Sequence, residues 1–185
     1  MRIRTLLAAV GAAVVAACST TVPRAPVTVV PQVDLKRFMG DWYVIANIPT
    51  FLEKGAHNAV ESYRLDADGS IAVNFSFNAG AFDGPVKTYH PRGFVLDPTN
   101  ARWGMRFVWP IKADYRISYI ASDYSLTVIG REARDYVWIM ARTPTIPDAD
   151  YQRMVEFVTR EGYDVSKLQR VPQAATRPAP KVGAP

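Results

Sequence analysis

The sequence has few residues with which to build a catalytic or metal-binding site. Its 185 residues include one cysteine, Cys18, and two histidines, His57 and His90. A single cysteine excludes an intramolecular disulfide. The histidines stand apart from each other, and no Gly-x-Ser-x-Gly, His-Glu-x-x-His or phosphate-loop motif occurs. We therefore expect both histidines on the surface, no catalytic residue, no metal site and no cofactor.

A strong charge of one sign is also missing. The formal net charge is +5, and two of these charges belong to Arg2 and Arg4 at the extreme N-terminus. No basic cluster interleaved with aromatic residues occurs, so nucleic acid is not an expected partner.

No apolar run is long enough to cross a bilayer, which takes about 20 residues. The longest run starts at Leu6, is broken by Gly11 and stops before Ser19. Because Arg2 and Arg4 precede it and small residues end it, the run has the form of a cleaved export signal.

The end of this run, Val15-Ala16-Ala17-Cys18, resembles a bacterial lipobox. The resemblance implies that residues 1–17 are removed and that Cys18 becomes a lipidated N-terminus. Ser19, in place of an aspartate, implies the outer membrane as the destination, with the domain facing the periplasm. The alternative is a plain export signal in which the cysteine occurs by chance.

Proline-rich segments flank a single domain. Residues 18–33 carry Pro23, Pro26 and Pro31 and are expected to form an extended tether. Residues 171–185, rich in proline and alanine, are expected to form a disordered tail. The 34–170 segment between them is long enough for one domain with its own core.

Within this domain, aromatic and β-branched runs alternate with turn signals such as Asp68-Gly69 and Ser122-Asp123. Such spacing predicts antiparallel strands joined by tight turns. The expected strands are 42–48, 58–66, 70–78, 86–95, 101–109, 115–121, 125–130 and 136–142.

After Pro147 the hydrophobic period changes. In the 148–161 segment the apolar residues fall at helical spacing, and Gly162 is placed to end the helix. Its polar face mixes acids and bases, so we expect it to cover the barrel rather than lie on a membrane. The predicted fold is an all-β, eight-stranded antiparallel up-and-down barrel with one C-terminal α-helix packed outside.

Three short motifs, in order, resemble the signatures of the lipocalins. They are Gly40-Asp41-Trp42-Tyr43, the turn Ser122-Asp123-Tyr124, with serine for the usual threonine, and Arg142 at the end of the last strand. The strings WYVIANIP, DYVWIMARTPTIPD and TREGYDVSKL resemble bacterial lipocalins and their apolipoprotein D-like relatives.

The lipocalin resemblance gives the signature residues structural roles. It implies that Trp42 closes the floor of the barrel and that Arg142 lies across its ring in a cation–π contact. Gly40 is expected at a sharp start where no side chain fits, above a short helical cap at 34–39. Gly40, Trp42, Asp123 and Arg142 are therefore expected to shape the fold and not to touch ligand.

The interior of an eight-stranded barrel holds one small ligand, and alternate residues of each strand face it. Taking Trp42 as inward, we expect Tyr63, Val73 and Ile117 to face inward, with Tyr63 and Val73 as filler near the floor. The expected ligand-binding residues are Glu61, Phe75, Phe77, Tyr89, Met105, Phe107, Tyr115, Tyr119, Trp138 and Met140. A bulge would reverse the phase of any strand, and a solid core remains the alternative.

Glu61 is the most informative of these residues, because a carboxylate in an apolar lumen must be paired, protonated or opposite a polar headgroup. The alternative is an outward-facing, solvated position. At the open end, Phe51 and Leu52 are expected to form a lid, and Trp109-Pro110-Ile111 to lie at the same rim. Exposed apolar residues there could also touch the bilayer.

We therefore expect an outer-membrane lipoprotein that holds a fatty acid or lysophospholipid-like amphiphile for storage or transport in the cell envelope. The alternatives are a structural envelope protein with a filled barrel and, less favoured, a lipid hydrolase. A homodimer is left open.

Overall fold

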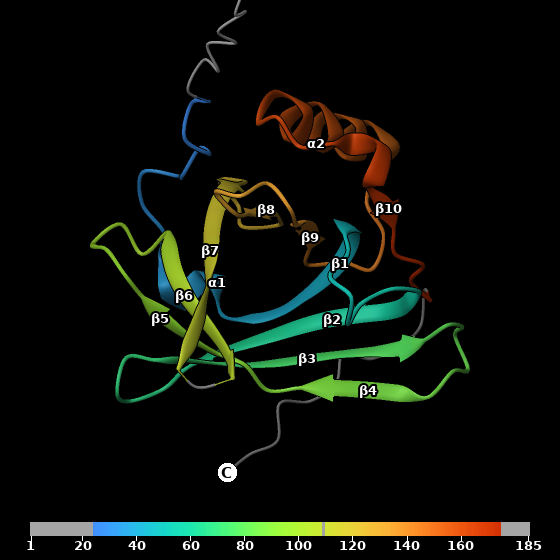
Figure 1. Ribbon diagram of the computed structural model, residues 1–185, viewed down its shortest axis with the longest axis horizontal. Coiled ribbons are helices and arrows are strands. Elements are labelled where there is room, and N and C mark those ends of the chain that lie inside the picture. The colour runs from blue at the N-terminus through green and yellow to red at the C-terminus, as the bar shows by residue number, and fades with distance from the viewer. Residues whose placement is uncertain (1–23, 109, 175–185) are drawn as a thin grey trace, which may run out of the picture.

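The computed structural model describes residues 24–108 and 110–174 (Figure 1). The predictions for the export signal, Cys18, Trp109 and residues 175–185 lie outside this part of the chain. In the part that is described, no helix is long and apolar enough to cross a membrane.

The domain is one antiparallel sheet that closes on itself because β1 pairs with both β2 and β9. β4 and β5 occupy one position in the barrel, and β10 adds to an edge of β1, so the barrel has the predicted eight strands with one C-terminal helix. The strands are β1 Gly40–Ile48, β2 Ala56–Leu65, β3 Ile71–Ala79, β4 Val86–Tyr89, β5 Arg92–Val95, β6 Arg102–Val108, β7 Ile111–Ile120, β8 Leu126–Gly130, β9 Val137–Ala141 and β10 Gln169–Arg170. The helices are α1 Leu35–Phe38, α2 Asp148–Arg160 and the 3-10 turn η1 Val165–Lys167.

Three strand predictions need correction. The single strand expected at 86–95 is interrupted between Tyr89 and Arg92, where Pro91 has no amide hydrogen to give to a ladder. β7 begins at Ile111 rather than at residue 115. β10 was not expected, because a strand of two residues is too short to show an alternating pattern.

Helix α2 packs on the outside of the barrel, as its pattern predicted. Met154 and Val158 are buried in a cluster with Ile45, Val128 and Ile139, which point away from the lumen. Gly162, at a φ of +83°, follows the helix end in the left-handed conformation that glycine adopts without strain.

The first residues of the predicted tail are part of the domain. β1 and β2 pair only near the start of β1, and the 169–174 segment lies along the rest of that gap. There the Gln173 amide donates to the carbonyls of Val44 and Ala59, both over 2.9 Å. Its side chain thus satisfies backbone groups that the diverging strands leave free.

The described part of the predicted tether is also held on the barrel. The Val30 amide donates to the Ile117 carbonyl over 3.0 Å, and the Val33 amide donates to the Thr99 carbonyl over 2.8 Å. Residues 24–33 therefore run along the outside of the barrel.

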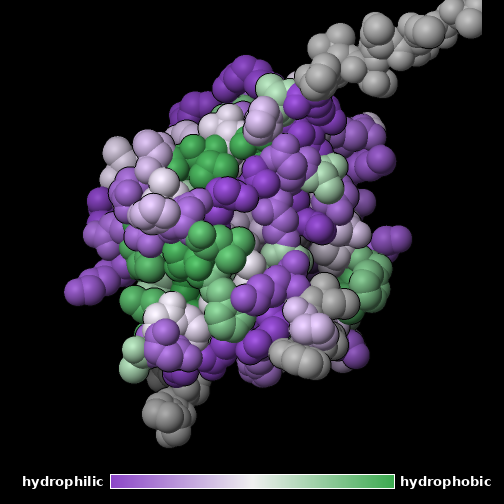
Figure 2. All heavy atoms as spheres, turned by 60° about the vertical axis from the view of Figure 1, so that its left-hand side comes forward, coloured by the Kyte–Doolittle hydropathy of each residue, from purple (hydrophilic) through white to green (hydrophobic). Residues whose placement is uncertain are grey.

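The two ends of the barrel differ. The closed end consists of α1 and the turns at 66–70, 96–101 and 121–125; the open end consists of the connections at 49–55, 80–85 and 131–136 and the β6–β7 turn. The surface in Figure 2 is mostly hydrophilic, with hydrophobic side chains gathered in a few patches.

Candidate ligand cavity

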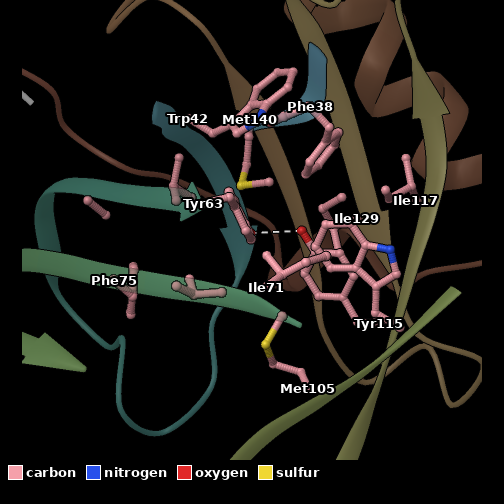
Figure 3. Packing of buried hydrophobic residues seen from close by; sticks show 14 of the residues in the cluster. Phe38, Trp42, Tyr63, Ile71, Phe75, Met105, Tyr115, Ile117, Ile129 and Met140 are labelled. Atoms are coloured by element: carbon pink, nitrogen blue, oxygen red, sulfur yellow. Dashed lines mark hydrogen bonds between the residues drawn. The ribbon is translucent and has the colours of Figure 1, made fainter. Parts of the chain in front are cut away.

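A layer of buried aromatic rings forms the floor of the barrel (Figure 3). Phe38 meets Trp42, Tyr63 and Trp103 at centroid distances of 5.1, 5.5 and 5.3 Å. Trp103 stacks on Tyr115 at 4.9 Å. The Trp42 indole donates to the Phe38 carbonyl over 2.8 Å, so the closing residue is fixed in place by α1.

Arg142 lies beneath this floor, with its guanidinium 3.7 Å from the centre of the Trp42 ring. It also donates to the carbonyls of residues 37–39 and of Asp41 over 2.7–3.0 Å. Burial lowers the pKa of Arg142 to about 10, which leaves it cationic at neutral pH. Gly40 is required by its φ of +92° and not by crowding, because an added Cβ would lie 3.5 Å from the guanidinium.

The Ser122-Asp123-Tyr124 turn joins β7 to β8 at the same end. The Asp123 carboxylate accepts from the amide and hydroxyl of Ser125, over 3.0 and 2.7 Å, and these bonds lower the pKa of Asp123. The Tyr124 hydroxyl accepts from the backbone amide of Asp34, whose side chain caps α1. The signature residues thus build the closed end, away from the lumen.

Above the floor is a cavity of about 330 Å³, which is within the range of small-molecule sites. Its wall is almost entirely apolar, and it opens toward the connections at 49–55 and 131–136. It is lined by Thr50, Phe51, Leu52, Glu53, Glu61, Val73, Phe75, Pro91, Met105, Phe107, Ala113, Asp114, Tyr115, Arg131, Tyr136 and Trp138.

Six of the ten residues expected to bind ligand line this cavity: Glu61, Phe75, Met105, Phe107, Tyr115 and Trp138. Val73, expected as filler, lines it too, whereas Tyr63 lies in the floor. The lid residues Phe51 and Leu52 are at its mouth.

Three of the other expected residues, Met140, Phe77 and the partly buried Tyr89, do not line the cavity. Met140 is fully buried in the core with Ile117. Phe77 packs against Phe75 and Tyr89, at centroid distances of 5.3 and 6.3 Å, in an aromatic group on β3 and β4 that reaches the cavity only through Phe75. These side chains fill space.

The inward position expected for Tyr119 is wrong. The pairing of β7 with β8 shifts register between Ile117 and Tyr119. Ile117 faces the core, whereas Tyr119 contacts Phe157 of α2 on the outer face, with ring centroids 5.6 Å apart. A bulge has reversed the phase of the strand.

Glu53, which the strand pattern missed, is the polar centre of the lid. Its buried carboxylate accepts hydrogen bonds from the Trp138 indole and the Asn47 amide, each over 2.8 Å, and from the Thr50 hydroxyl over 2.7 Å. Burial raises the pKa of Glu53. The sequence signal that could have identified Glu53 is its position as a single acidic residue directly after Phe51-Leu52.

Glu61 faces the bottom of the cavity, close to the floor. Its carboxylate accepts from the Tyr63 hydroxyl, and the Tyr63 and Tyr115 hydroxyl oxygens are 2.8 Å apart (Figure 3). No cation among the described residues forms a salt bridge with Glu61. Burial, with a smaller contribution from the charge on Glu53, raises the pKa of Glu61 to about 7.

Arg131 provides a cation at the mouth, a role that the sequence did not reveal. Its Nη1 is 3.1 Å from the Asp135 carboxylate and its guanidinium lies over the Tyr136 ring at 5.3 Å. Its buried Nε has no hydrogen-bond partner among residues 24–108 and 110–174. Arg131 therefore places a positive charge, paired with Asp135, in the wall of the cavity mouth.

The histidines do not contribute to this site. His90 is exposed, while His57 is only partly so and contacts the Gly55 carbonyl and the Phe82 ring. In the described part of the chain, no group of three histidine, cysteine, aspartate or glutamate residues is placed to hold a metal ion.

Comparisons with known proteins agree over most of the chain. The family model for the lipocalin-like domain matches residues 33–173. The outer membrane lipoprotein Blc of Citrobacter freundii is 38% identical over 175 residues, which cover 94% of this chain and 98% of that protein. Temperature-induced lipocalin-1 of Arabidopsis thaliana is 33% identical over 160 residues, 81% of this chain and 84% of that protein.

A solved structure supports the fold. Insecticyanin from the tobacco hornworm Manduca sexta superposes with a TM-score of 0.61 at 17% identity, covering 80% of this chain and 84% of that one.

Proposed function

The chain belongs to the lipocalin family, and we propose that it is an outer-membrane lipoprotein that holds a fatty acid or lysophospholipid-like amphiphile for storage or transport in the cell envelope. The lipocalin-like domain over residues 33–173 supports a binding protein rather than an enzyme. The observation that carries the proposal is the apolar cavity of about 330 Å³ above the aromatic floor.

The ligand lies with its tail inward. Each methylene buried against the apolar wall contributes about 0.8 kcal/mol, which offsets the cost of ordering a single chain. The guanidinium of Arg131 lines the mouth, where a carboxylate or phosphate group would lie. A lipid with two acyl chains would need more volume, so an amphiphile with a single acyl chain fits best.

The alternative of a structural protein with a filled barrel has less support. Such a barrel would have side chains in place of the cavity, as Met140 and Ile117 occupy the core beside the floor. Here Val73, Met105 and Ala113 border open space.

The anchor is proposed at Cys18. The lipobox-like residues 15–18 support it, and so do relatives named outer membrane lipoproteins that are 37–38% identical over nearly their whole length. Mass spectrometry of the native protein should show a diacylated or triacylated Cys18 at the N-terminus, and Cys18→Ser should release the protein from membranes. An unmodified thiol or an intact Met1 would contradict the anchor.

The ligand is tested by extracting lipids from purified Cys18→Ser protein and identifying them by mass spectrometry. Ala113→Phe fills part of the cavity, and Ala67→Phe, at an exposed closed-end turn, is the matched control. We expect a single-chain lipid in the Ala67→Phe form and much less in the Ala113→Phe form. Equal amounts in the two variants would contradict binding in the cavity.

A further inference from the structure

We propose that the open end of the barrel rests on the bilayer in which the chain is anchored. The contact is made by the open-end hydrophobic side chains, defined as Phe51, Phe82, Val86 and Phe107. This inference depends on the lipid anchor at Cys18 proposed above.

Exposed hydrophobic side chains are distributed unevenly over the barrel. Five large ones stand out among the described residues, and four of them are the open-end set, which extends from the β1–β2 connection to the end of β6. The fifth, Leu96, follows β5 at the closed end. Hydrophobic groups gathered at one end of a protein mark a contact with a partner or a membrane.

Two of the open-end side chains belong to the cavity wall as well as to the surface. Phe51 is 79% exposed and Phe107 is 54% exposed, and both line the cavity. An apolar path therefore runs from the surface into the lumen. A bilayer that covered Phe51 and Phe107 would place its acyl chains at the mouth, where a single-chain lipid enters.

The N-terminal segment joins the domain at this same end. Arg134, in the β8–β9 connection, donates to the Ala25 carbonyl over 2.6 Å, and the Val27 amide donates to the Glu132 carboxylate over 3.3 Å. From there the chain runs to Val33 at the closed end, where it is bonded to Thr99. A tether that starts at Cys18 thus reaches the barrel beside its mouth.

The length of the tether limits the orientation. The six residues 18–23 span about 20 Å at full extension. β1, with nine residues, rises about 23 Å along the axis if its tilt is about 40°, before the turns at either end are added. A closed end pressed against the bilayer would therefore require residues 25–33 to leave the barrel and lose their hydrogen bonds.

The charges around the open-end hydrophobic side chains also suit a lipid surface. Lys54 and Lys87 are exposed close in sequence to Phe51 and Val86, and neither takes part in an ion pair within the described residues. Asp83, beside Phe82, is exposed too and offsets one of these charges. Each exposed lysine near an anionic membrane surface adds to the attraction.

The orientation is tested on the acylated protein in vesicles of phosphatidylethanolamine and phosphatidylglycerol. Because Cys18 is the only natural cysteine and is acylated, a nitroxide label attaches only to an introduced cysteine. We place it by Phe51→Cys, Phe107→Cys, Leu96→Cys or, on the exposed side of α2, Gln152→Cys, and measure accessibility to oxygen and to a water-soluble nickel complex.

We expect the labels at 51 and 107 to be shielded from nickel and exposed to oxygen, and the labels at 96 and 152 to behave as in water. Retention on the vesicles with water-like labels at 51 and 107, or with a membrane-like label at 96 or 152, would overturn the orientation alone. Protein that does not stay on the vesicles would overturn the anchor and, with it, this inference.

A second measurement uses the Cys18→Ser form, in which the surface contact acts without the anchor. Phe82 and Val86 do not line the cavity, and Leu96 is 54% exposed, close to the 57% of Val86. We expect the double change Phe82→Ser and Val86→Ser to weaken co-sedimentation with the same vesicles about tenfold, and Leu96→Ser to leave it unchanged. Equal effects of the open-end and closed-end changes would contradict the inference.

Discussion

The indole of Trp138 donates a hydrogen bond to the carboxylate of Glu53 over 2.8 Å at the mouth of the cavity. This bond ties the 49–55 connection to β9. It also places the Trp138 ring where a bound lipid would pass.

In a Trp109→Phe background, which removes the tryptophan expected at the same rim, Trp138→Phe should remove most of the tryptophan fluorescence change that lipid binding produces. Trp42 and Trp103 are fully buried in the floor and have no surface facing the cavity, so they should respond weakly. The measurement is tryptophan emission during titration of delipidated protein with a fatty acid. An undiminished signal in the variant would place the lipid elsewhere.

Glu61→Gln should stabilise the protein at pH 8 and have little effect at pH 4. The pKa of Glu61 is about 7 in the folded state against an ordinary 4.5, so the folded protein holds the proton more tightly than the unfolded chain. The contribution of Glu61 to stability is therefore greatest below pH 4.5 and falls as the pH rises through 7, by about 3 kcal/mol in all. Urea unfolding of wild type and variant at several pH values measures the difference.

The control for this experiment is Glu156→Gln, an exposed position on α2. It makes the same chemical change outside the barrel and is measured over the same pH range. If Glu61→Gln behaved like Glu156→Gln, the carboxylate of Glu61 would have to be solvated or paired with a cation.

Arg142→Ala should destabilise the fold by about 3 kcal/mol and leave lipid affinity nearly unchanged. The change removes the cation–π contact with Trp42 and leaves the carbonyls of residues 37–39 and Asp41 without their donor. Denaturant unfolding and lipid titration of the same preparation test both halves. A stable variant that has lost binding would contradict a purely structural role.

Removing residues 171–185 should destabilise the domain, whereas removing only 175–185 should not. The shorter deletion keeps Gln173, whose side-chain amide donates hydrogen bonds to the carbonyls of Val44 and Ala59, and it keeps the buried Val171. Gln173→Ala in the full chain should alone cost about 1–2 kcal/mol, because two buried carbonyls lose their donor. Thermal unfolding compares the two deletions and Gln173→Ala with the wild type. Equal stability of all four forms would show that the tail begins at Val171.

The sequence contained enough information for the barrel and its closed end. Alternation located the strands and the change of period located α2, because each is a repeated pattern along the chain. The contact of Trp42 with Arg142 joins distant parts of the sequence, and it was expected only because short motifs resemble the lipocalin signatures. The Val86–Val95 segment was harder to predict, since only the single proline at 91 marks its interruption.

The cavity wall was predicted less well, because it depends on register and on loops. Tyr119 and Phe77 have the same alternating pattern as Phe75. A shift in strand pairing turns Tyr119 outward, and Phe77 packs against Phe75 instead of lining the cavity. Glu53 and Arg131 lie in connections, where no periodicity indicates which way a side chain points. Gln173 acts on strands more than a hundred residues away in sequence, which no local signal reveals.

Titration of delipidated Cys18→Ser protein with lysophosphatidylcholine and with a fatty acid, followed by calorimetry, tests the central claim most directly. We expect saturable binding of one molecule per barrel at micromolar affinity or better in wild type and in Ala67→Phe, and a loss of about tenfold or more in Ala113→Phe. Absence of saturable binding by either lipid, or equal affinity in Ala113→Phe, would contradict a lipid-holding cavity.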